Sequence, residues 1–173
     1  ELKKVQYDYI QSEDYGAVER LTRMYVENGY KTIVVVGGDM VMSLARRRGV
    51  DILPIDSEHS AIMQCLQGEA RGAIRRLLIT CSGGALRDLP RESLGSVTAE
   101  MALKHPQWRM GAKITIDSAT LVNKGFEVIE AVHLFGVAPE KVEVLIHRES
   151  IIHSMVEYID NSIIAQMSVP DMR

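Results

Sequence analysis

The sequence has few cysteines, no long apolar run and no excess of positive charge, and these shortages exclude several classes of protein. Its two cysteines, Cys65 and Cys81, have neither the spacing of a metal site nor that of a disulfide framework, which is typical of a reducing compartment. No apolar run is long enough to span a membrane, and the first residues lack the pattern of a signal peptide. The net charge of −3 provides no basic surface for nucleic acid. We therefore expect a cytoplasmic protein with no nucleic-acid partner and no membrane partner.

The residues that are present indicate an α/β fold. Apolar residues make up 46% of the 173 residues, which is enough for the core of one ordinary domain. Short β-branched runs alternate with helically spaced apolar residues, and consecutive strands follow at the end. Helices are expected at 13–28, 40–48, 58–67, 96–104 and 122–135, and strands at 31–36, 51–56, 76–80, 113–117, 142–147, 151–158 and 163–169. Thr98 is the expected N-cap of its helix. The abrupt runs 1-ELKKVQYDYI and 170-PDMR indicate a piece of a longer polypeptide.

Two acidic residues follow the apolar run 52-ILPI-55. Asp56 and Glu58 are two residues apart, so their side chains would point to the same side if this run is a strand that continues. The alternative is that Asp56 caps a helix whose first turn contains Glu58.

Further acidic residues lie on the predicted helix 122–135. Asn123, Glu127 and Glu130 are spaced i, i+4 and i+7 and share one face, so Glu127 could meet the acidic pair across a crevice. Three carboxylates that point to one place repel one another unless a cation lies among them, and oxygen ligands suit Mg²⁺ or Mn²⁺. The sequence therefore predicts a divalent metal site. The alternative is that Glu127 and Glu130 belong to a solvated helix face.

Polar residues follow three of the predicted strands, in 56-DSEH-59, 81-CSGG-84 and 117-DSAT-120. We expect them to converge, because ligands of such sheets bind beyond the carboxyl ends of the strands. The glycines after Ser82 would let the backbone approach a ligand, and Ser118 and Asn123 would lie at a helix start that favours phosphate. Lys124 adds a positive charge. The set fits a phosphorylated small molecule that also chelates the metal, whereas the alternative for Ser-Gly-Gly is a simple turn.

The remaining candidates are ambiguous by themselves. His105, in 105-HPQW-108, could be a loop histidine, and His153 alternates with apolar neighbours as a core histidine would. Met110 and Met172 would ordinarily fill gaps in a core.

Three stretches resemble the 1-deoxy-D-xylulose 5-phosphate reductoisomerase family, namely 53-LPIDSEHSAI-62, 105-HPQWRMGAKITIDSATLVNKGFEVIEA-131, and 153-HSMVEY-158 with 163-IIAQMSVPDMR-173. The resemblance covers about residues 30–173. It implies an NADP-dependent oxidoreductase that converts 1-deoxy-D-xylulose 5-phosphate to 2-C-methyl-D-erythritol 4-phosphate in non-mevalonate isoprenoid biosynthesis. It also implies NADPH and Mn²⁺, Mg²⁺ or Co²⁺ as cofactors, and a homodimer in bacterial cytoplasm or plastid stroma. We expect the strands within 142–169 at the dimer interface.

The resemblance also implies roles for individual residues. The implied metal ligands are Asp56, Glu58 and Glu127. The implied substrate contacts are Ser57, Ser82, His105, Ser118, Asn123 and Lys124. The implied catalytic residues are Lys124, His105, Trp108, Glu130 and His153, with Trp108 on a closing loop and Glu130 near the metal. The implied cofactor contacts are Lys31, Met110 and Met172.

The resemblance is incomplete towards the cofactor domain. The run 37-GGDM-40 is not G-x-G-x-x-G, and of the Asn-Lys-Glu of the family only Lys31 is present. By analogy residues 32–48 are largely helical, which leaves the strand at 31–36 open. We expect residues 1–50 to be the tail end of an incomplete, Rossmann-like NADPH domain. We expect residues 51–173 to be a catalytic domain with a mixed sheet flanked by helices.

Two other functions stay open at this point. One is a non-catalytic or fragmentary module that binds metal and a phosphosugar. The other is a metal-dependent phosphosugar aldolase or isomerase without hydride transfer.

Overall fold

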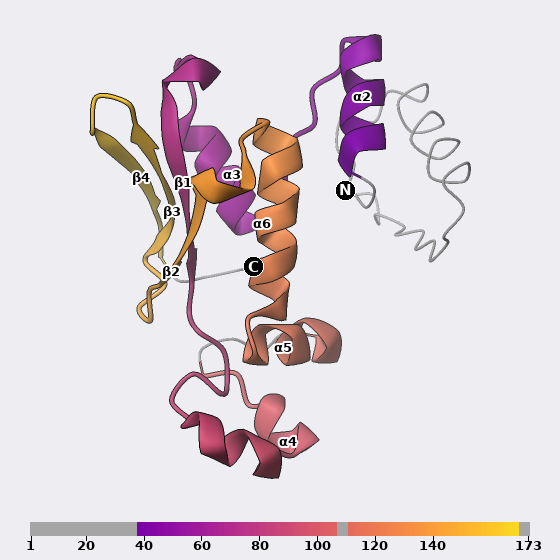
Figure 1. The fold of residues 1–173 in the computed structure, drawn as a ribbon, viewed down its shortest axis with the longest axis vertical. Coiled ribbons are helices and arrows are strands. Elements are labelled where there is room, and N and C mark those ends of the chain that lie inside the picture. Colours follow the sequence, from indigo (N-terminus) through magenta and orange to yellow (C-terminus); the bar gives the residue numbers. More distant parts are fainter. Residues whose placement is uncertain (1–37, 107–110, 170–173) are drawn as a thin grey trace, which may run out of the picture. The chain divides into compact units, whose positions relative to one another are not determined.

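The computed structural model describes residues 38–106 and 111–169, and the chain divides into two compact units, Glu1–Ile52 and Leu53–Arg173. The described element of the first unit is helix α2, Gly38–Arg48 (Figure 1). Asp39 lies in its first turn and arginines lie in its last, which complements the helix dipole. This helix confirms the one predicted at 40–48. The elements predicted at 13–28 and 31–36 lie outside the described residues.

The second unit is built on a four-stranded mixed sheet in the order β2-β1-β3-β4. Its strands are β1 (Ile74–Cys81), β2 (Val142–Ile146), β3 (Ile152–Tyr158) and β4 (Ile163–Met167). Strand β1 pairs parallel with β2 and antiparallel with β3, and β3 pairs antiparallel with β4. The four consecutive residues 77–80 of the central strand β1 are buried, as in a strand covered on both faces. The sheet confirms the α/β class and the strands predicted at 76–80, 142–147, 151–158 and 163–169.

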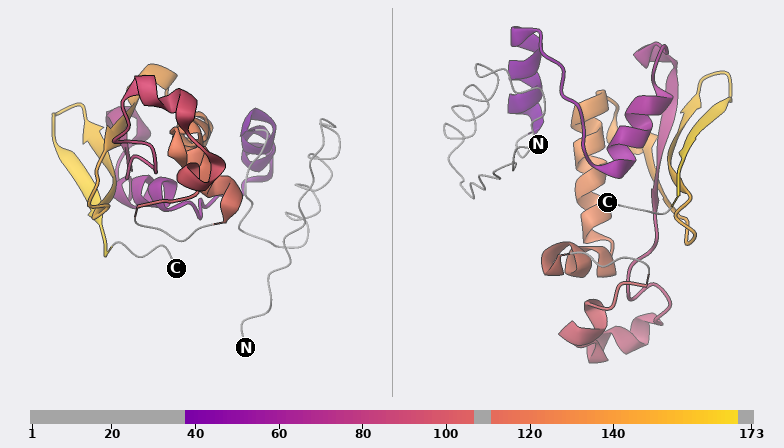
Figure 2. Two further views of the ribbon diagram at one scale, coloured as in Figure 1. Left: turned by 90° about the horizontal axis from the view of Figure 1, so that it is seen from below. Right: turned by 180° about the vertical axis from the view of Figure 1, so that it is seen from behind.

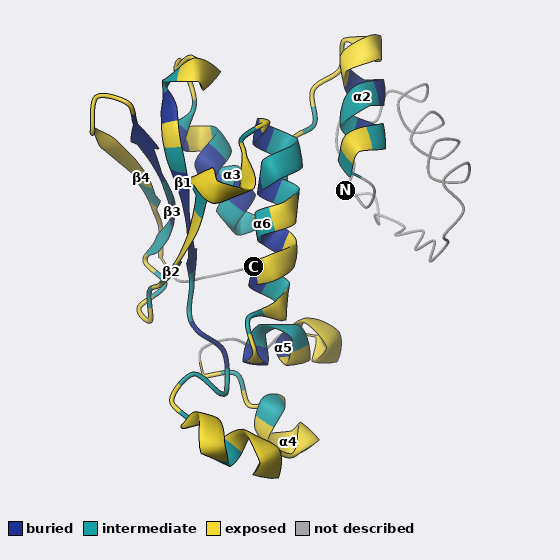
Figure 3. Cartoon of the chain, viewed as in Figure 1, coloured by how far each residue is buried: buried dark blue, intermediate teal, exposed yellow. Residues whose placement is uncertain are grey.

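Helices α3 (Ser57–Cys65) and α6 (Val122–Phe135) cover the same face of the sheet (Figures 1 and 2). The core lies between these helices and the strands, where Figure 3 shows the buried positions gathered. Its members are Ile62, Cys65, Ile74, Leu77, Ile79, Ala131, Phe135, Val156 and Tyr158. The Tyr158 hydroxyl donates to the Cys65 carbonyl at 2.5 Å and ties β3 to the end of α3. These helices confirm the ones predicted at 58–67 and 122–135. No helix in the described ranges has the length and apolar character to cross a membrane.

The strand predicted at 51–56 is wrong. These residues form a link without regular structure, in which Pro54 has no N–H to give to a neighbouring strand. Asp56 then begins helix α3 as its N-cap, so its side chain satisfies a helix N–H instead of extending a strand.

The strand predicted at 113–117 is also wrong, because these residues lie in helix α5 (Ala112–Ala119). Its β-branched residues favour a strand locally. Within the helix, however, the buried Thr115 donates its hydroxyl to the Gly111 carbonyl at 2.9 Å. Lys113 and Asp117 form an i, i+4 ion pair at 2.5 Å. Packing of α5 against α6 and α4 therefore outweighs the local preference.

The helix predicted at 96–104 is shorter and less regular than expected. A 3₁₀ helix, Arg91–Ser96, precedes helix α4 (Ala99–Ala102), and most of both is exposed (Figure 3). Thr98 is the N-cap, as predicted, and its hydroxyl accepts from the Met101 N–H at 3.3 Å.

Candidate functional site

A pocket of about 600 Å³ lies in the second unit, where the first turns of α3 and α6 meet the end of β1. The turn after β1, the α5–α6 junction, the start of β3 and the end of β4 complete its lining. It brings together ten residues that were singled out in the sequence, namely Asp56, Ser57, Glu58, Ser82, His105, Ser118, Asn123, Lys124, Glu127 and His153. The structure thus gathers residues that are up to about a hundred positions apart along the chain.

Two glycines allow the turn after β1 to approach helix α5. Gly83 and Gly84 have φ angles of +96° and +73°, in the left-handed region that favours glycine. A Cβ on Gly84 would lie 2.0 Å from the Ser118 carbonyl oxygen. Ser82 and Ser118 are therefore held on one side of the pocket. Ser118 is near the end of α5 and donates to the Thr115 carbonyl at 3.0 Å, so its predicted place at a helix start is wrong.

Three carboxylates meet at the opposite side. Asp56, Glu58 and Glu127 each place an oxygen within 4.8 Å of the others. Asp56 Oδ1 accepts from the Glu58 N–H at 3.0 Å as the N-cap of α3, so the helix cap and the acidic cluster coexist. Three oxygens so close together form a donor set that suits a hard divalent cation.

The amino group of Lys124 lies in the same cluster. It donates to Glu58 Oε1 at 2.8 Å and to Glu127 Oε2 at 2.5 Å, and only 5% of the lysine is exposed. Asn123, in the first turn of α6, donates to the other oxygen of Glu127 at 2.6 Å. One lysine beside three carboxylates leaves an excess of negative charge, which a divalent cation would balance.

The pKa values of the cluster reflect this imbalance. Burial, followed by the charge of Glu58, raises the pKa of Glu127 to about 8. Burial and the same neighbour also raise the pKa of Asp56. Burial also tends to raise the pKa of Glu58. The positive charge of Lys124 and its hydrogen bond outweigh the effect of burial, so the pKa of Glu58 is lowered. Lys124 therefore pairs with an ionised Glu58, while Glu127 holds a proton near neutral pH that a bound cation would displace.

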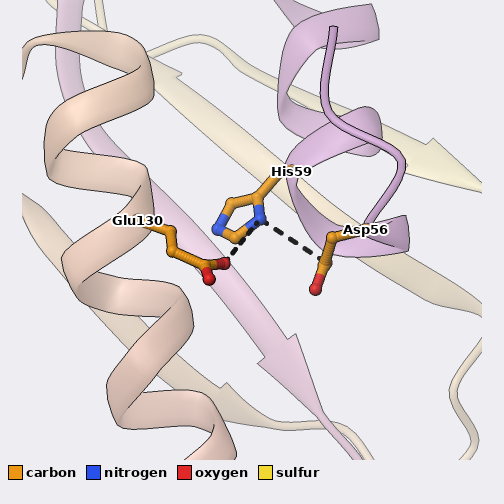
Figure 4. Close-up of side chains that lie close together, drawn as sticks. All are labelled: Asp56, His59 and Glu130. Atoms are coloured by element: carbon orange, nitrogen blue, oxygen red, sulfur yellow. Dashed lines mark ion pairs between the residues drawn. The ribbon is translucent and has the colours of Figure 1, made fainter. Parts of the chain in front are cut away.

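His59 connects this cluster to Glu130 (Figure 4). Its buried imidazole places Nε2 2.9 Å from the backbone oxygen of Glu127, so Nε2 carries a hydrogen and donates it. Its Nδ1 lies 3.6 Å from a carboxylate oxygen of Asp56 and 3.6 Å from one of Glu130. Glu130 is not part of the pocket lining and approaches the acids through this ring. Asp56, His59 and Glu130 are a second group that could hold a metal, with one nitrogen in the donor set.

Sequence reasoning did not single out His59. The signal was its i, i+3 spacing from Asp56, which places both side chains on one face if Asp56 caps the helix, as in the alternative given above.

Of the other predicted site residues, some have contacts in the structure and others lie outside the residues that it describes. Ser82 Oγ and His105 Nε2 are 3.1 Å apart, and burial followed by the charge of Arg87 lowers the pKa of His105, so its ring is neutral near pH 7. The Ser57 hydroxyl donates to the Glu58 carboxylate. Lys31, Trp108, Met110 and Met172 lie outside the described residues.

The pocket lies in a part of the chain that is similar to proteins of one known family. Residues 52–135 match the family model of the 1-deoxy-D-xylulose 5-phosphate reductoisomerase C-terminal domain. The curated reductoisomerase of Geobacillus kaustophilus (strain HTA426) is 60% identical over 143 residues, which are 83% of this chain and 37% of the relative. That of Anaeromyxobacter sp. (strain K) is 54% identical over 164 residues, which are 91% of this chain and 42% of the relative. The chain thus spans about two fifths of the length of these relatives.

Solved structures agree with the sequence relatives. A crystal structure of DOX-P reductoisomerase in complex with NADPH, fosmidomycin and magnesium matches with a TM-score of 0.75 at 40% identity, over 84% of this chain and 40% of that one. The 1-deoxy-D-xylulose 5-phosphate reductoisomerase from Zymomonas mobilis in complex with NADPH matches with a TM-score of 0.72 at 48% identity, over 79% and 35%.

Proposed function

Because this chain belongs to the 1-deoxy-D-xylulose 5-phosphate reductoisomerase family, we propose that it supplies the catalytic part of an NADPH- and metal-dependent reductoisomerase. The reaction converts 1-deoxy-D-xylulose 5-phosphate to 2-C-methyl-D-erythritol 4-phosphate in non-mevalonate isoprenoid biosynthesis. The observation that carries the proposal is the buried cluster of Asp56, Glu58, Glu127 and Lys124 in a pocket of a chain 60% identical to a curated reductoisomerase. The curated relatives are named as reductoisomerases, which argues against a binding module without catalysis.

Asp56, Glu58 and Glu127 would hold Mg²⁺ or Mn²⁺. The donor set fits, because it consists of three carboxylate oxygens within 4.8 Å of one another and one lysine does not balance its charge. When bound, the ion supplies Lewis-acid polarisation of the carbonyl group of the substrate and orients its oxygens. Lys124 brings a second positive charge to the same place, where its amino group can reach an oxygen of the ligand. Glu130 acts through His59, which keeps Asp56 and the backbone of Glu127 in position.

The side of the pocket that holds Ser82 and Ser118 would bind the phosphate. These serines bring hydroxyl groups. Asn123 and Lys124, which contact Glu127 from the start of α6, would give their remaining N–H groups to the same anion. The neutral His105 ring lies beside the Ser82 hydroxyl and lines the pocket with it. The phosphate does not react, but the binding energy at this group positions the reacting carbons of the substrate.

NADPH supplies the hydride for the reduction, and the reaction takes up one proton. Lys31 is proposed to contact NADPH, and Met110 and Met172 are proposed to lie beside its nicotinamide. Trp108 is proposed to belong to a loop that closes over the substrate and excludes water from the hydride step.

A homodimer in the bacterial cytoplasm is the proposed form of the protein. Strand β4 is an edge of the sheet. Its side chains Ile163, Ile164 and Met167 are 52%, 43% and 61% exposed, so an apolar edge is open to a second copy.

A turnover assay tests the proposed function. The protein is incubated with 1-deoxy-D-xylulose 5-phosphate, NADPH and Mg²⁺, NADPH absorbance is followed, and the product is identified by mass spectrometry. We expect one NADPH to be consumed for each 2-C-methyl-D-erythritol 4-phosphate formed, and we expect EDTA to stop the reaction. Substrate conversion without NADPH consumption would indicate an aldolase or isomerase, and tight binding without any conversion would indicate a binding module.

A further inference from the structure

The pocket has a third side that the proposed metal and phosphate sites leave unused. It is formed by the start of β3 and the end of β4, and its polar residues His153, Gln166 and Ser168 include no acid and no permanently charged group. Two of its polar atoms, His153 Nε2 and Gln166 Oε1, are buried and have no hydrogen-bond partner in the described part of the chain. Such atoms are rare in folded proteins because leaving them unpaired is unfavourable. Their presence in one pocket points to a ligand group that satisfies both.

A β-bulge explains how these two residues come to line the same pocket. Ile152 pairs with Met167 and Ser154 pairs with Gln166, so β3 advances by two residues where β4 advances by one. His153 is the extra residue, and bulges next to functional sites change the direction of a side chain. The Thr80 hydroxyl lies 2.8 Å from the carbonyl oxygens of both Ile152 and His153, which holds the bulge in place.

Ser154 provides a contrast on the same strand. Its hydroxyl is also buried without a partner in the described part of the chain, but Ser154 does not line the pocket. A ligand in the pocket therefore lies beside His153 and Gln166 and not beside this serine.

We propose that Gln166 is a specificity-determining residue that binds, together with His153, an uncharged hydroxyl group of the phosphosugar. This rests on the proposed function, which places the phosphate at Ser82, Ser118 and Asn123. A hydroxyl fits because it is donor and acceptor at once: it can donate to Gln166 Oε1 and accept from, or donate to, an imidazole nitrogen. Reversing the Gln166 amide would exchange an acceptor for a donor, and a hydroxyl would suit that arrangement equally well.

The ribose hydroxyls of NADPH have the same chemistry as the sugar hydroxyls, so the test treats the two ligands separately. Gln166→Met removes the amide and keeps nearly the same volume. The matched control is Gln64→Met, since Gln64 lies in the same pocket but is exposed and already donates to Ser60 Oγ at 3.3 Å. Each protein is titrated calorimetrically, in Mg²⁺, with 1-deoxy-D-xylulose 5-phosphate, with inorganic phosphate and with NADPH.

We expect Gln166→Met to bind 1-deoxy-D-xylulose 5-phosphate about 3–10-fold more weakly, the loss of one hydrogen bond, and to bind inorganic phosphate and NADPH within about twofold of the wild type. The control should match the wild type with all three ligands. An unchanged phosphosugar affinity, a loss confined to NADPH, or an equal loss with inorganic phosphate would each overturn the assignment. If Gln166→Met does not fold, Gln166→Asn, which withdraws the amide by one methylene, gives the same reading. A wild-type protein that does not bind the phosphosugar would instead refute the proposed function.

Discussion

Replacing Glu127 with glutamine separates the role of this residue in metal binding from its effect on stability. Glu127 is 4% exposed and is hydrogen-bonded by Lys124 and Asn123. Because its pKa is about 8, it is protonated near neutral pH when no metal is bound. Glutamine has nearly the shape of the protonated acid, and Asn123 can turn its amide so that its oxygen accepts from the glutamine N–H, so Glu127→Gln should fold well. It cannot ionise, however, and so offers a cation one neutral oxygen in place of a carboxylate.

The magnitude follows from the pKa of Glu127. It rises from 4.5 to about 8, and at about 1.4 kcal/mol per unit the ionised form costs the folded protein at most about 5 kcal/mol. Since the folded state keeps this proton to higher pH than the unfolded chain, the contribution of Glu127 to wild-type stability in EDTA falls as the pH rises from 4.5 to about 8 and then levels off. Glu127→Gln lacks this decline. At about pH 8 we expect its Tm in EDTA to exceed that of the wild type by about 5 °C or more.

Differential scanning calorimetry in EDTA, from about pH 5 to about pH 8, measures this difference, and titration with Mg²⁺ measures the metal site. We expect Glu127→Gln to bind Mg²⁺ at least about tenfold more weakly. Replacing even a residue that only hydrogen-bonds a metal ligand typically lowers metal affinity about 10–100-fold. Glu92→Gln, at an exposed glutamate of the 3₁₀ helix 91–96, is the control and should match the wild type in both measurements. Parallel stability profiles for Glu127→Gln and the wild type, together with equal Mg²⁺ affinities, would show that Glu127 neither holds a proton near neutral pH nor binds the metal.

Further predictions concern the remaining parts of the second unit. Gly84→Ala should lower the free energy of unfolding by about 2–4 kcal/mol, because its Cβ would lie 2.0 Å from a backbone oxygen; urea denaturation with unchanged stability would contradict this. Asn123→Ala should weaken a phosphorylated ligand by about 1.5–3 kcal/mol, and an equal loss with the dephosphorylated sugar would argue against a phosphate contact. His59→Leu should lower stability by about 1–3 kcal/mol and Mg²⁺ affinity by about tenfold, because the Glu127 carbonyl loses its donor; calorimetry that finds both values unchanged would remove His59 from the site. Ile163→Lys should convert a dimer to a monomer in sedimentation experiments, and a persisting dimer would exclude β4 from the interface.

Most helices and strands are predictable from the sequence, because there the local pattern of apolar residues and the tertiary packing favour the same element. The helical spacing of apolar residues in 122–135 and the short apolar run 77–79 each favour one kind of element, and the structure confirms both. The run 113–117 has the same local character as β1 and is nevertheless a helix. What distinguishes it is contact with α6 and α4, and local sequence does not encode such contacts.

The candidate site was predicted partly for the wrong reason. Three strand ends were expected to converge, but only residues 81–84 follow a strand, while Asp56 begins a helix and Ser118 ends one. Their side chains still line one pocket because helix termini lie there as well. The i, i+3 spacing of Lys124 and Glu127 on one helix is visible in the sequence. The sequence offers no sign that Lys124 also joins Glu58, or that His59 donates to a carbonyl 68 positions away, because both contacts depend on how α3 packs beside α6.

The position of a bound Mn²⁺ ion, located by anomalous diffraction from crystals grown with MnCl₂, tests the proposed metal site most directly. We expect the ion among the carboxylates of Asp56, Glu58 and Glu127, with Lys124 Nζ moved away from at least one of its two present partners. An ion coordinated by the imidazole of His59 together with Asp56 and Glu130 would contradict this assignment, because the metal would then lie in the second cluster.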